Sequence, residues 1–465
     1  MNAALETQVP ARLDGVVEQR LLTGWGRTAP TLAAVSSPRA ADGVAAALAA
    51  AGARGVIARG LGRSYGDAAQ NAGGSVVDMT SFAGVRALDL ERDEVTVDAG
   101  ISIEALTRFL VPRGRFPAVV PGTGKVTVGG AIASDIHGKN HHRDGGFDDH
   151  VVALELLSAS GEVLEAARGD AAFEATAGGM GLTGVILGAT LALRRIETSR
   201  MRVDTERASD LDDLMAKMTS GDSDYRYSVA WIDCLARGAG LGRSILLRGE
   251  HAVPADLPPA DRERPLELPR FRSVAAPPWA PPGLLSTATM RAFNELWFRR
   301  APAERRGLLE GVRQFFHPLD AVDGWNRLYG PRGMLQYQFV VPLGAEPTMR
   351  SILERLSSAG TGSFLAVFKR MGEPSGALSF PMRGWTLTLD MPAGDGRLVE
   401  LLDGLDELVA AAGGRVYLAK DSRLRPELLD AMYPGLERWR EARSRLDPHG
   451  RMRSDLDRRL GLVAA

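Results

Sequence analysis

The chain has 465 residues, of which 45% are apolar and 24% charged, a length for two or three domains and an ordinary globular composition. With 56 Lys and Arg against 57 Asp and Glu, it lacks the basic balance of a nucleic-acid-binding protein. Its single cysteine, Cys234, excludes a disulfide framework and a cysteine-rich metal site. No apolar stretch reaches membrane-spanning length and residues 1–20 lack the apolar core of a secretory signal, so we expect at most peripheral membrane contact.

Residues 31–198 alternate apolar runs typical of strands with one helical run. The helix is predicted over 37–52, with Ser37 as N-cap, Pro38 at the first helical position and Gly52 past the end. Strands and a hairpin are predicted at 55–60, 75–80, 94–100, 155–166 and 184–196.

Beyond residue 199 the predicted strands are longer and richer in aromatic residues. They lie at 226–233, 335–342, 362–369 and 385–392. Residues 253–283 interrupt them with nine of the 26 prolines, which predicts a mobile lid or surface loop without regular structure. After Gly414 a short strand over 415–423 is predicted to lead into an arginine-rich helical tail.

The stretch ARGLGRSYGD at residues 58–67 resembles a dinucleotide-binding turn. Gly60 and Gly62 fit the first two glycines of the Rossmann fingerprint, but Tyr65 takes the third place and no helix follows. A glycine-rich loop of successive N–H groups still binds anions well, so this loop can hold a pyrophosphate without a Rossmann unit. The alternative is a plain turn between two strands.

A second glycine-rich segment spans residues 121–146. Its glycines at 129 and 130 are predicted to open a helix, where a phosphate can approach free N–H groups. Two separated glycine-rich loops on one α+β domain suggest an extended ligand such as FAD. A third segment, residues 177–187, places small residues before a strand, where an adenine or flavin edge can pack.

Three histidines in the second segment raise a metal alternative. The His-x3-His pair of His137 and His141 is half of a zinc site, but no third ligand of the right type is near in sequence. The sequence also lacks the G-x-S-x-G elbow of a serine hydrolase. His137 therefore either orients its loop by a hydrogen bond or contacts a flavin directly.

Five motifs together resemble the vanillyl-alcohol-oxidase-type flavoproteins, and within them the branch that oxidises decaprenylphosphoryl-ribose at C2′. The resemblance covers residues 22–460 and rests on the segments 60–71, 121–142, 178–184, 335–342 and 417–423. It implies a two-domain α+β fold with an FAD domain (1–198), an antiparallel-sheet substrate domain (199–414) and a C-terminal segment (415–465) that returns to the FAD domain.

The resemblance also implies a set of cofactor contacts. The expected FAD-binding residues are Ala58, Arg59, Gly60, Leu61, Gly62, Arg63, Ser64, Tyr65, Gly66, Asp67, Ala68, Gly122, Thr127, Val128, Gly129, Gly130, Ser134, Asp135, Ile136, His137, Ile186 and Tyr417. Many relatives tether FAD to a histidine in the first loop. This chain has Arg63, Ser64 and Tyr65 there, so we expect non-covalent FAD.

The implied reaction moves a hydride from C2′ of decaprenylphosphoryl-ribose to FAD and leaves a 2′-keto sugar. A separate NADH-dependent reductase would then return a hydride to the other face, giving the arabinose epimer for cell-wall arabinan. The implied location is peripheral, at the inner membrane of an actinobacterium. Pro277, Pro278, Trp279, Pro281 and Pro282 suit an apolar entrance for the lipid tail. Trp297 and Phe298 beside paired arginines suit an anionic membrane, or pack inward on an amphipathic helix.

Alcohol oxidation needs a proton acceptor and a group that stabilises negative charge on the flavin. Lys420, expected on the last strand, suits both tasks, or else forms a surface salt bridge with Asp421. Tyr65 and His137 complete the candidate catalytic set. The candidate substrate residues, each with the plain alternative of a polar strand position, are Gln336, Gln338, Lys369, Thr386 and Thr388.

Two other classes of protein remain open at this point. One is a soluble oxidase of small sugars, of the aldonolactone or alditol kind. The proline-rich segment argues against this class, because a small polyol needs no entrance for a lipid tail. The other is a non-catalytic polyprenyl-phosphate-binding protein, which would lack FAD.

Overall fold

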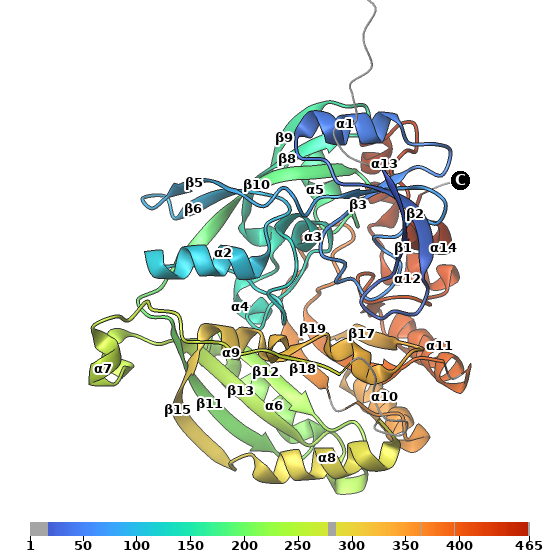
Figure 1. The fold of residues 1–465 in the computed structure, drawn as a ribbon. Helices are drawn as coiled ribbons and strands as arrows, with labels where there is room; N and C mark the ends of the chain where they lie inside the picture. Colours follow the sequence, from blue (N-terminus) through green and yellow to red (C-terminus); the bar gives the residue numbers. More distant parts are fainter. Residues whose placement is uncertain (1–16, 278–284, 364, 395, 464–465) are drawn as a thin grey trace, which may run out of the picture.

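The computed structural model describes residues 17–277, 285–363, 365–394 and 396–463. The N-terminal strands and the C-terminal helices lie together above a large sheet built from the middle of the chain (Figure 1). Three sheets organise these residues, and a fourth, two-stranded parallel sheet joins β14 (Val274–Ala275) to β16 (Val322–Asp323).

The smallest of the three sheets has the strand order β1-β2-β4-β3. β2, β4 and β3 run parallel, and β1 adds an antiparallel edge. Val56, Ile57, Val76 and Val77 are fully buried, as is typical of parallel strands covered on both faces. The strands are β1 (Glu18–Leu22), β2 (Thr31–Ser36), β3 (Val56–Arg59) and β4 (Ser75–Asp78).

The second sheet is antiparallel, with the order β5-β6-β10-β8-β9 and β7 paired to the far end of β10. The predicted hairpin at 155–166 is confirmed as β8 and β9, and the predicted long strand as β10. Its strands are β5 (Val85–Asp89), β6 (Glu94–Asp98), β7 (Arg115–Pro117), β8 (Val151–Ser158), β9 (Val163–Ala167) and β10 (Gly184–Arg195).

The third sheet has eight antiparallel strands in the order β15-β11-β13-β12-β18-β19-β17-β20. β17 and β19 pair in unbroken register along nine residues, from Met334 opposite Pro392 to Pro342 opposite Gly384. The strands are β11 (Arg200–Ala208), β12 (Tyr227–Ile232), β13 (Ser244–His251), β15 (Glu304–Gly311), β17 (Met334–Pro342), β18 (Ala366–Met371), β19 (Gly384–Pro392) and β20 (Arg415–Val416).

Helices cover these sheets and close the chain. α6, α10 and α11 contact strands of the eight-stranded sheet, and α13 packs against α5 of the N-terminal part. The α-helices are α1 (Ala41–Ala49), α2 (Ile103–Leu110), α3 (Val128–Ala133), α4 (His141–Asp144), α5 (Ala171–Thr176), α6 (Leu211–Gly221), α7 (Pro259–Arg262), α8 (Thr287–Arg300), α9 (Val312–Phe316), α10 (Glu346–Ala359), α11 (Gly396–Ala411), α12 (Leu429–Met432), α13 (Leu436–Leu446) and α14 (Asp455–Leu460).

The C-terminal segment returns to the N-terminal sheets after Val416, the last residue of β20. Met452 bridges Val56 of β3, and the indole N–H of Trp439 donates to the carbonyl of Ala175 at 2.9 Å. The guanidinium of Arg459 forms two hydrogen bonds, of 2.9 and 2.8 Å, with the carboxylate of Asp67. Residues far apart in sequence thereby fix the first glycine-rich loop.

Three local predictions were wrong. The first helix begins at Ala41 with Ala40 as its N-cap, so Ser37 does not cap it. The proline-rich segment contains regular structure, namely α7 and β14, while residues 278–284 lie outside the described residues. Lys420 lies in a turn after β20, because its N–H donates to the carbonyl of Tyr417 at 2.9 Å. Among the helices of the described residues, none has the length and apolar character of a membrane span.

Candidate flavin and substrate site

The first glycine-rich loop follows β3 and is held by close backbone packing. A Cβ at Gly60 would clash with the side chain of Thr127, and one at Gly66 with the backbone of Asp421. Gly62 has a φ of +63°, a conformation that favours glycine. Within the described residues, no backbone N–H of residues 60–64 donates a hydrogen bond. A fixed loop with free N–H groups can bind an anion such as a pyrophosphate.

The polar side chains of this loop are occupied by the protein itself. Arg59 donates to the carbonyls of Thr23 at 2.7 Å and Ala69 at 2.8 Å. The guanidinium of Arg63 lies 3.9 Å from the ring centroid of Trp25, and Asp67 pairs with Arg459. Ala58, Leu61 and Ala68 offer backbone groups and apolar atoms, and Ser64 adds one hydroxyl. A ligand on this loop is therefore bound mainly through the backbone.

The second glycine-rich segment forms the predicted helix, α3, but not a free anion site. The hydroxyl of Thr127 caps it by accepting from the N–H of Gly130 at 3.2 Å. The N–H groups of Val128 and Gly129 donate to the carbonyls of Ile101 at 2.9 Å and Ala99 at 2.7 Å. The expectation that a phosphate meets free N–H groups there was therefore wrong. A Cβ at Gly122, in contrast, would meet no atom within 4 Å, which leaves room for a ligand.

Residues 134–137 connect α3 to Tyr417. The Tyr417 hydroxyl donates to the carbonyl of Ser134 at 2.6 Å, and its ring stacks on Phe380 with centroids 4.5 Å apart. Asp135 has a φ of +40° and accepts hydrogen bonds from Ser375 and Ser379 at 3.0 and 2.5 Å. Ile136 and, on β10, Ile186 are buried apolar neighbours in this part of the domain.

His137 makes one of the direct contacts between the two domains. The Gln338 side-chain amide donates to Nε2 of His137 at 2.9 Å, and the His137 ring lies 5.3 Å from that of Tyr417. Burial, with the charges of Lys369, His141 and Lys420, holds the pKa of His137 well below its usual range. His137 is therefore neutral, with Nδ1 as its proton-bearing nitrogen when Gln338 donates. No group of three metal-ligating side chains occurs among the described residues.

One face of three adjacent strands collects every predicted substrate residue. The register places Gln338 opposite Thr388, and Thr386 opposite Lys369 of β18. Because strand side chains alternate, Gln336, Gln338, Thr386 and Thr388 share this face, while Leu387 and Leu389 point into the core. The hydroxyl of Thr386 donates to the carbonyl of Phe339 at 2.8 Å, and Thr388 is half-buried.

Lys420 lies where this face meets the first glycine-rich loop. The N–H of Tyr65 donates to the carbonyl of Ala419 at 3.0 Å, and Nζ of Lys420 lies 4.2 Å from the Tyr65 ring centroid. The alternative of a surface salt bridge with Asp421 does not hold, because Asp421 pairs with Arg459 at 2.8 Å and Lys420 is buried. Burial lowers the pKa of Lys420.

Asp390 is a site residue that the sequence analysis missed. It is 2% exposed and accepts a hydrogen bond from the Gln336 side-chain amide at 2.5 Å. Burial raises the pKa of Asp390, while the charge of Lys420 opposes that rise. The signal was available, since Asp390 follows Thr386 and Thr388 in the same alternation along β19.

Lys139, also missed, forms a second cationic group with Lys369. Burial, with the charges of Lys139 and Lys420, lowers the pKa of Lys369 to about 7. Burial lowers the pKa of Lys139 to about 8, against the opposing charge of Glu310. Nζ of Lys139 contacts the carbonyl of Phe315, and Nζ of Lys369 lies 3.4 Å from that of Gly138. Two half-buried lysines that lack a bound carboxylate among the described residues suit an anionic ligand.

Comparison with known proteins identifies the family of this chain. Residues 32–167 match a sequence family described as an FAD binding domain, and residues 395–460 match the D-arabinono-1,4-lactone oxidase family. Over 450 residues the chain is 44% identical to the decaprenylphosphoryl-β-D-ribose oxidase of Mycolicibacterium smegmatis, covering 95% of this chain and 97% of that protein. The chain belongs to the decaprenylphosphoryl-β-D-ribose oxidase family. It is an FAD-dependent oxidoreductase with the expected two-domain α+β flavoprotein fold.

Two further relatives show how much of the chain is similar to other proteins. An uncharacterized protein of Streptomyces coelicolor is 45% identical over 372 residues, which cover 78% of this chain and 100% of that protein. The L-gulonolactone oxidase of Mus musculus is 33% identical over 150 residues, only 31% of this chain and 34% of that oxidase. The likeness to small-sugar oxidases is thus partial. A role as a non-catalytic binding protein is excluded by the family.

The residues present fit the cofactor of this oxidase family. The free N–H groups of residues 60–64 suit the pyrophosphate, and the open space at Gly122 admits an extended ligand. Lys420, whose Nζ lies beside the Tyr65 ring, would supply a cation able to stabilise negative charge on a bound flavin. FAD, when bound, supplies the hydride acceptor.

Proposed function

We propose that this oxidase removes a hydride from C2′ of a polyprenylphosphoryl ribose, decaprenylphosphoryl-β-D-ribose being the substrate named for its mycolicibacterial relative. One observation carries the proposal: a single sheet face offers amide, hydroxyl and carboxylate groups and Lys369, and the charge of Lys139 acts on Lys369 from outside that face. A sugar with several hydroxyls and one phosphate requires this combination. A neutral lactone or polyol gives Lys139 and Lys369 no partner.

At the sugar end, the chain's own residues can position a hydroxyl and take its proton. Gln336 is fixed by Asp390 and Gln338 by His137, so each amide keeps one preferred orientation. Lys420 has its pKa lowered by burial, which increases the fraction of the neutral amine that can accept a proton. Asp390, whose charge favours the protonated amine, then stabilises the resulting ammonium.

At the phosphate end, the negative charge of the substrate phosphate would offset the repulsion between neighbouring lysines. Lys369 is flanked by Lys139 and Lys420 and its pKa is lowered by burial and by both neighbours. A phosphodiester placed between Lys369 and Lys139 would supply the missing negative charge and favour the protonated lysines. Binding energy from this end, which does not react, would hold C2′ in place for hydride transfer.

The product of this step is a ketone, which requires a second enzyme for epimerisation. We assign that role to a separate NADH-dependent keto-reductase, which would return a hydride from the opposite face. The resulting arabinose donor would serve arabinan synthesis in the cell wall. Because the substrate carries a lipid tail, the enzyme would work peripherally at the inner membrane.

The test is anaerobic reduction of the purified, yellow enzyme. We expect a short-chain polyprenylphosphoryl ribose to bleach the flavin absorbance within seconds, whereas L-gulono-1,4-lactone, alditols and free ribose leave it unchanged. Mass spectrometry should find a product lighter by two hydrogens. Bleaching by a lactone or polyol, with none by the phosphoribose, would instead establish the small-sugar alternative.

A further inference from the structure

The exposed side of α8 carries a cluster of large apolar side chains. Phe293, Leu296 and Trp297 are 42%, 58% and 50% exposed, while Met290 and Asn294, which border this cluster on the helix, are buried. Positions i, i+3 and i+4 lie together on a helix, and the rings of Phe293 and Trp297 stack with centroids 5.9 Å apart. We call these three residues, with Arg299 and Arg300 at the end of the same helix, the α8 surface. The alternative that these aromatics pack inward fails for Trp297.

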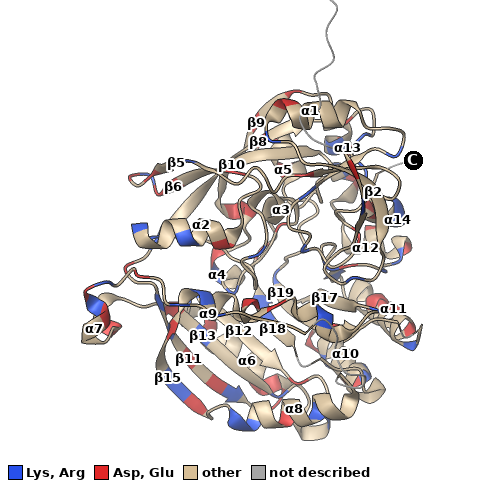
Figure 2. Ribbon diagram, in the orientation of Figure 1, with Lys and Arg blue, Asp and Glu red and all other residues tan. Residues whose placement is uncertain are grey.

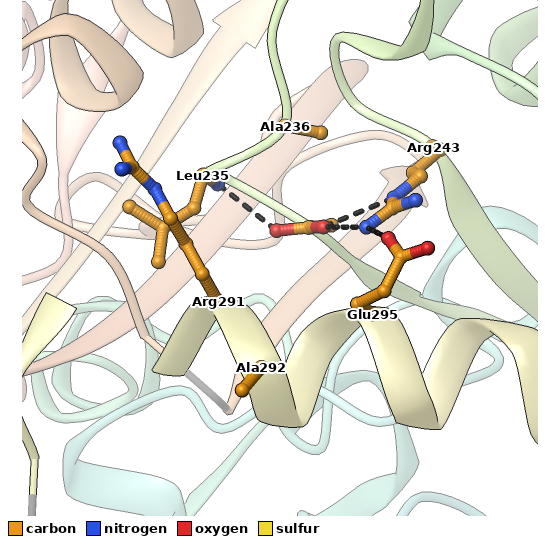
Figure 3. Close-up of a pocket in the computed structure, with 7 residues that line it drawn as sticks. Leu235, Ala236, Arg243, Arg291, Ala292 and Glu295 are labelled. Carbon is orange, nitrogen blue, oxygen red and sulfur yellow. Dashed lines mark hydrogen bonds and ion pairs between the residues drawn. The ribbon is translucent and has the colours of Figure 1, made fainter. Parts of the chain in front are cut away.

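The charges of α8 are predominantly positive at this surface. Its one acidic residue, Glu295, is bound by Arg299 and, at 2.7 Å, by Arg243 from outside the helix. Arg243 also pairs with Asp233 at 2.8 Å. Figure 3 shows Arg243 and Glu295 on one side of a pocket that Leu235, Ala236 and Ala292 also line. Arg291, Arg299 and Arg300 are exposed, and Figure 2 shows the basic end of the helix beside β15.

We propose that the α8 surface docks on an anionic lipid bilayer. Stacked aromatic rings with a leucine give the apolar area that enters the headgroup region, and arginines beside them attract anionic lipid. A second copy of the chain is a poorer partner, because two-fold pairing of this surface would bring the arginines of both copies together. The proposal rests on the proposed function for its purpose, since a lipid-linked substrate has to be taken from a bilayer.

The structure connects α8 directly to the substrate sheet. The side-chain amide of the buried Asn294 donates to Asp233 at 2.8 Å, and Asp233 follows directly on β12. β12 pairs with β18, Ala230 lying opposite Phe368, which is next to Lys369. A bilayer bound at the α8 surface would therefore lie against the domain that holds Lys369 of the phosphate end.

The test is flotation of the purified holoenzyme with phosphatidylcholine vesicles, with and without phosphatidylglycerol and free of any polyprenyl phosphate. We expect binding to the anionic vesicles. Phe293→Ser with Trp297→Ser should weaken partitioning roughly tenfold or more, because binding scales with buried apolar area. Arg299→Glu should weaken it at least roughly fivefold, the worth of one arginine at an anionic surface.

Matched controls come from the other domain. Leu32→Ser with Val163→Ser removes side chains that are 53% and 52% exposed, and Arg92→Glu reverses an arginine that, like Arg299, has a 76% exposed side chain. Both controls should bind vesicles like the wild type. All variants should still oxidise a water-soluble, short-chain polyprenylphosphoryl ribose, which separates this proposal from the proposed function.

Three results would overturn the proposal. The first is a wild-type protein that does not float with anionic vesicles. The second is a Phe293 and Trp297 variant that floats as well as the wild type. The third is a concentration-dependent dimer in analytical ultracentrifugation that those two substitutions abolish without any effect on vesicle binding, which would assign the α8 surface to a second copy.

Discussion

Gln336 and Asp390 face each other across β17 and β19, and the amide nitrogen of Gln336 lies 2.5 Å from a carboxylate oxygen of Asp390. Burial lowers the pKa of Lys420, and the negative charge of the same carboxylate acts in the opposite direction and raises it. One buried acid thus orients an amide that faces the sugar and sets the charge of the amine beside the flavin. We therefore regard Asp390 as a positioning residue that acts through Gln336 and Lys420.

Asp390→Asn should retain FAD but slow flavin reduction by roughly 100-fold, since it disturbs the orientation of Gln336 and the charge of Lys420 together. Without the nearby carboxylate the pKa of Lys420 should fall further, so the ascending limb of the pH–rate profile should move to lower pH. Stopped-flow reduction across pH measures both. Asp204→Asn, a strand carboxylate bonded to Tyr225 at 2.6 Å, is the control. An unmoved limb would show that Asp390 does not act through Lys420.

Lys420→Ala should bind FAD almost normally, because the glycine-rich loop and residues 134–137 hold the rest of the cofactor. The rate of flavin reduction should fall by roughly 100-fold or more, the range for loss of a positioned proton-transfer group. Lys125→Ala, which removes an ion pair with Asp323 at 2.6 Å, should retain the wild-type rate. If Lys420→Ala reduces its flavin as fast as the wild type, the base lies elsewhere, and Tyr65 is the next candidate.

Strand periodicity was enough to predict much of the site. Gln336 and Gln338, and likewise Thr386 and Thr388, were assigned to shared faces by alternation, and the structure places them side by side. The partners of those faces depend on which strands pair, and pairing is a long-range property that a local pattern does not contain. Lys139 was missed for this reason, because it gains its role from Lys369, far away in sequence. Asp390 could have been placed on the same face as Thr386 and Thr388 by alternation, but its pairing with Gln336 depends on the partner strand.

The glycines show a second limit of the sequence. A glycine-rich segment before a helix can leave N–H groups free for a phosphate, or it can allow two backbones to approach closely. In the segment around Gly129 the second case holds, since a Cβ there would lie 2.9 Å from that of Ala99. Of the two loops, the first, around Gly62, is the one that keeps its N–H groups free among the described residues. Both segments are rich in glycine, and which of the two arrangements forms depends on the parts of the chain that pack against each segment.

FAD should be bound without a covalent link. The loop over residues 58–68 contains no histidine or cysteine, and His137 is buried with its Nε2 hydrogen-bonded to Gln338. Acid precipitation of the protein should release all the yellow colour into the supernatant, as measured by flavin absorbance. A flavoprotein with a histidyl link, treated in parallel, should keep its colour in the pellet. Flavin fluorescence in the protein band of a denaturing gel would contradict this expectation.

Substrate affinity should depend on pH through Lys369. The phosphodiester stays anionic at all working pH values, whereas Lys369, with its pKa lowered to about 7, loses its charge as pH rises. Binding needs the protonated lysine, so KM should be constant below pH 7 and rise above it, approaching about tenfold per pH unit. Lys369→Arg, which stays charged, should remove this limb. A KM that is flat from pH 6 to 9 in the wild type would show that Lys369 does not bind the phosphate.

The last prediction concerns Thr388, at a position where the resemblance described above implies a cysteine in mycobacterial members of the family. Thr388 is half-buried and lies opposite Gln338, on the face that we assign to the substrate. Hydride transfer needs no second nucleophile, so a threonine of similar size should preserve activity. What is absent is a reactive thiol: Cys234 is fully buried, and burial raises the pKa of its thiol well above the usual range.

The native enzyme should therefore resist thiol-alkylating reagents, whereas Thr388→Cys should keep its activity and then lose it on alkylation. Intact-protein mass spectrometry should find no adduct on the native chain and one adduct on the variant. Substrate should protect the new cysteine, because it would occupy the same face. Ala236→Cys, at the pocket beneath α8, provides a cysteine remote from this face whose alkylation should leave activity unchanged. A Thr388→Cys variant that turns over but never labels would show that residue 388 does not line the substrate site.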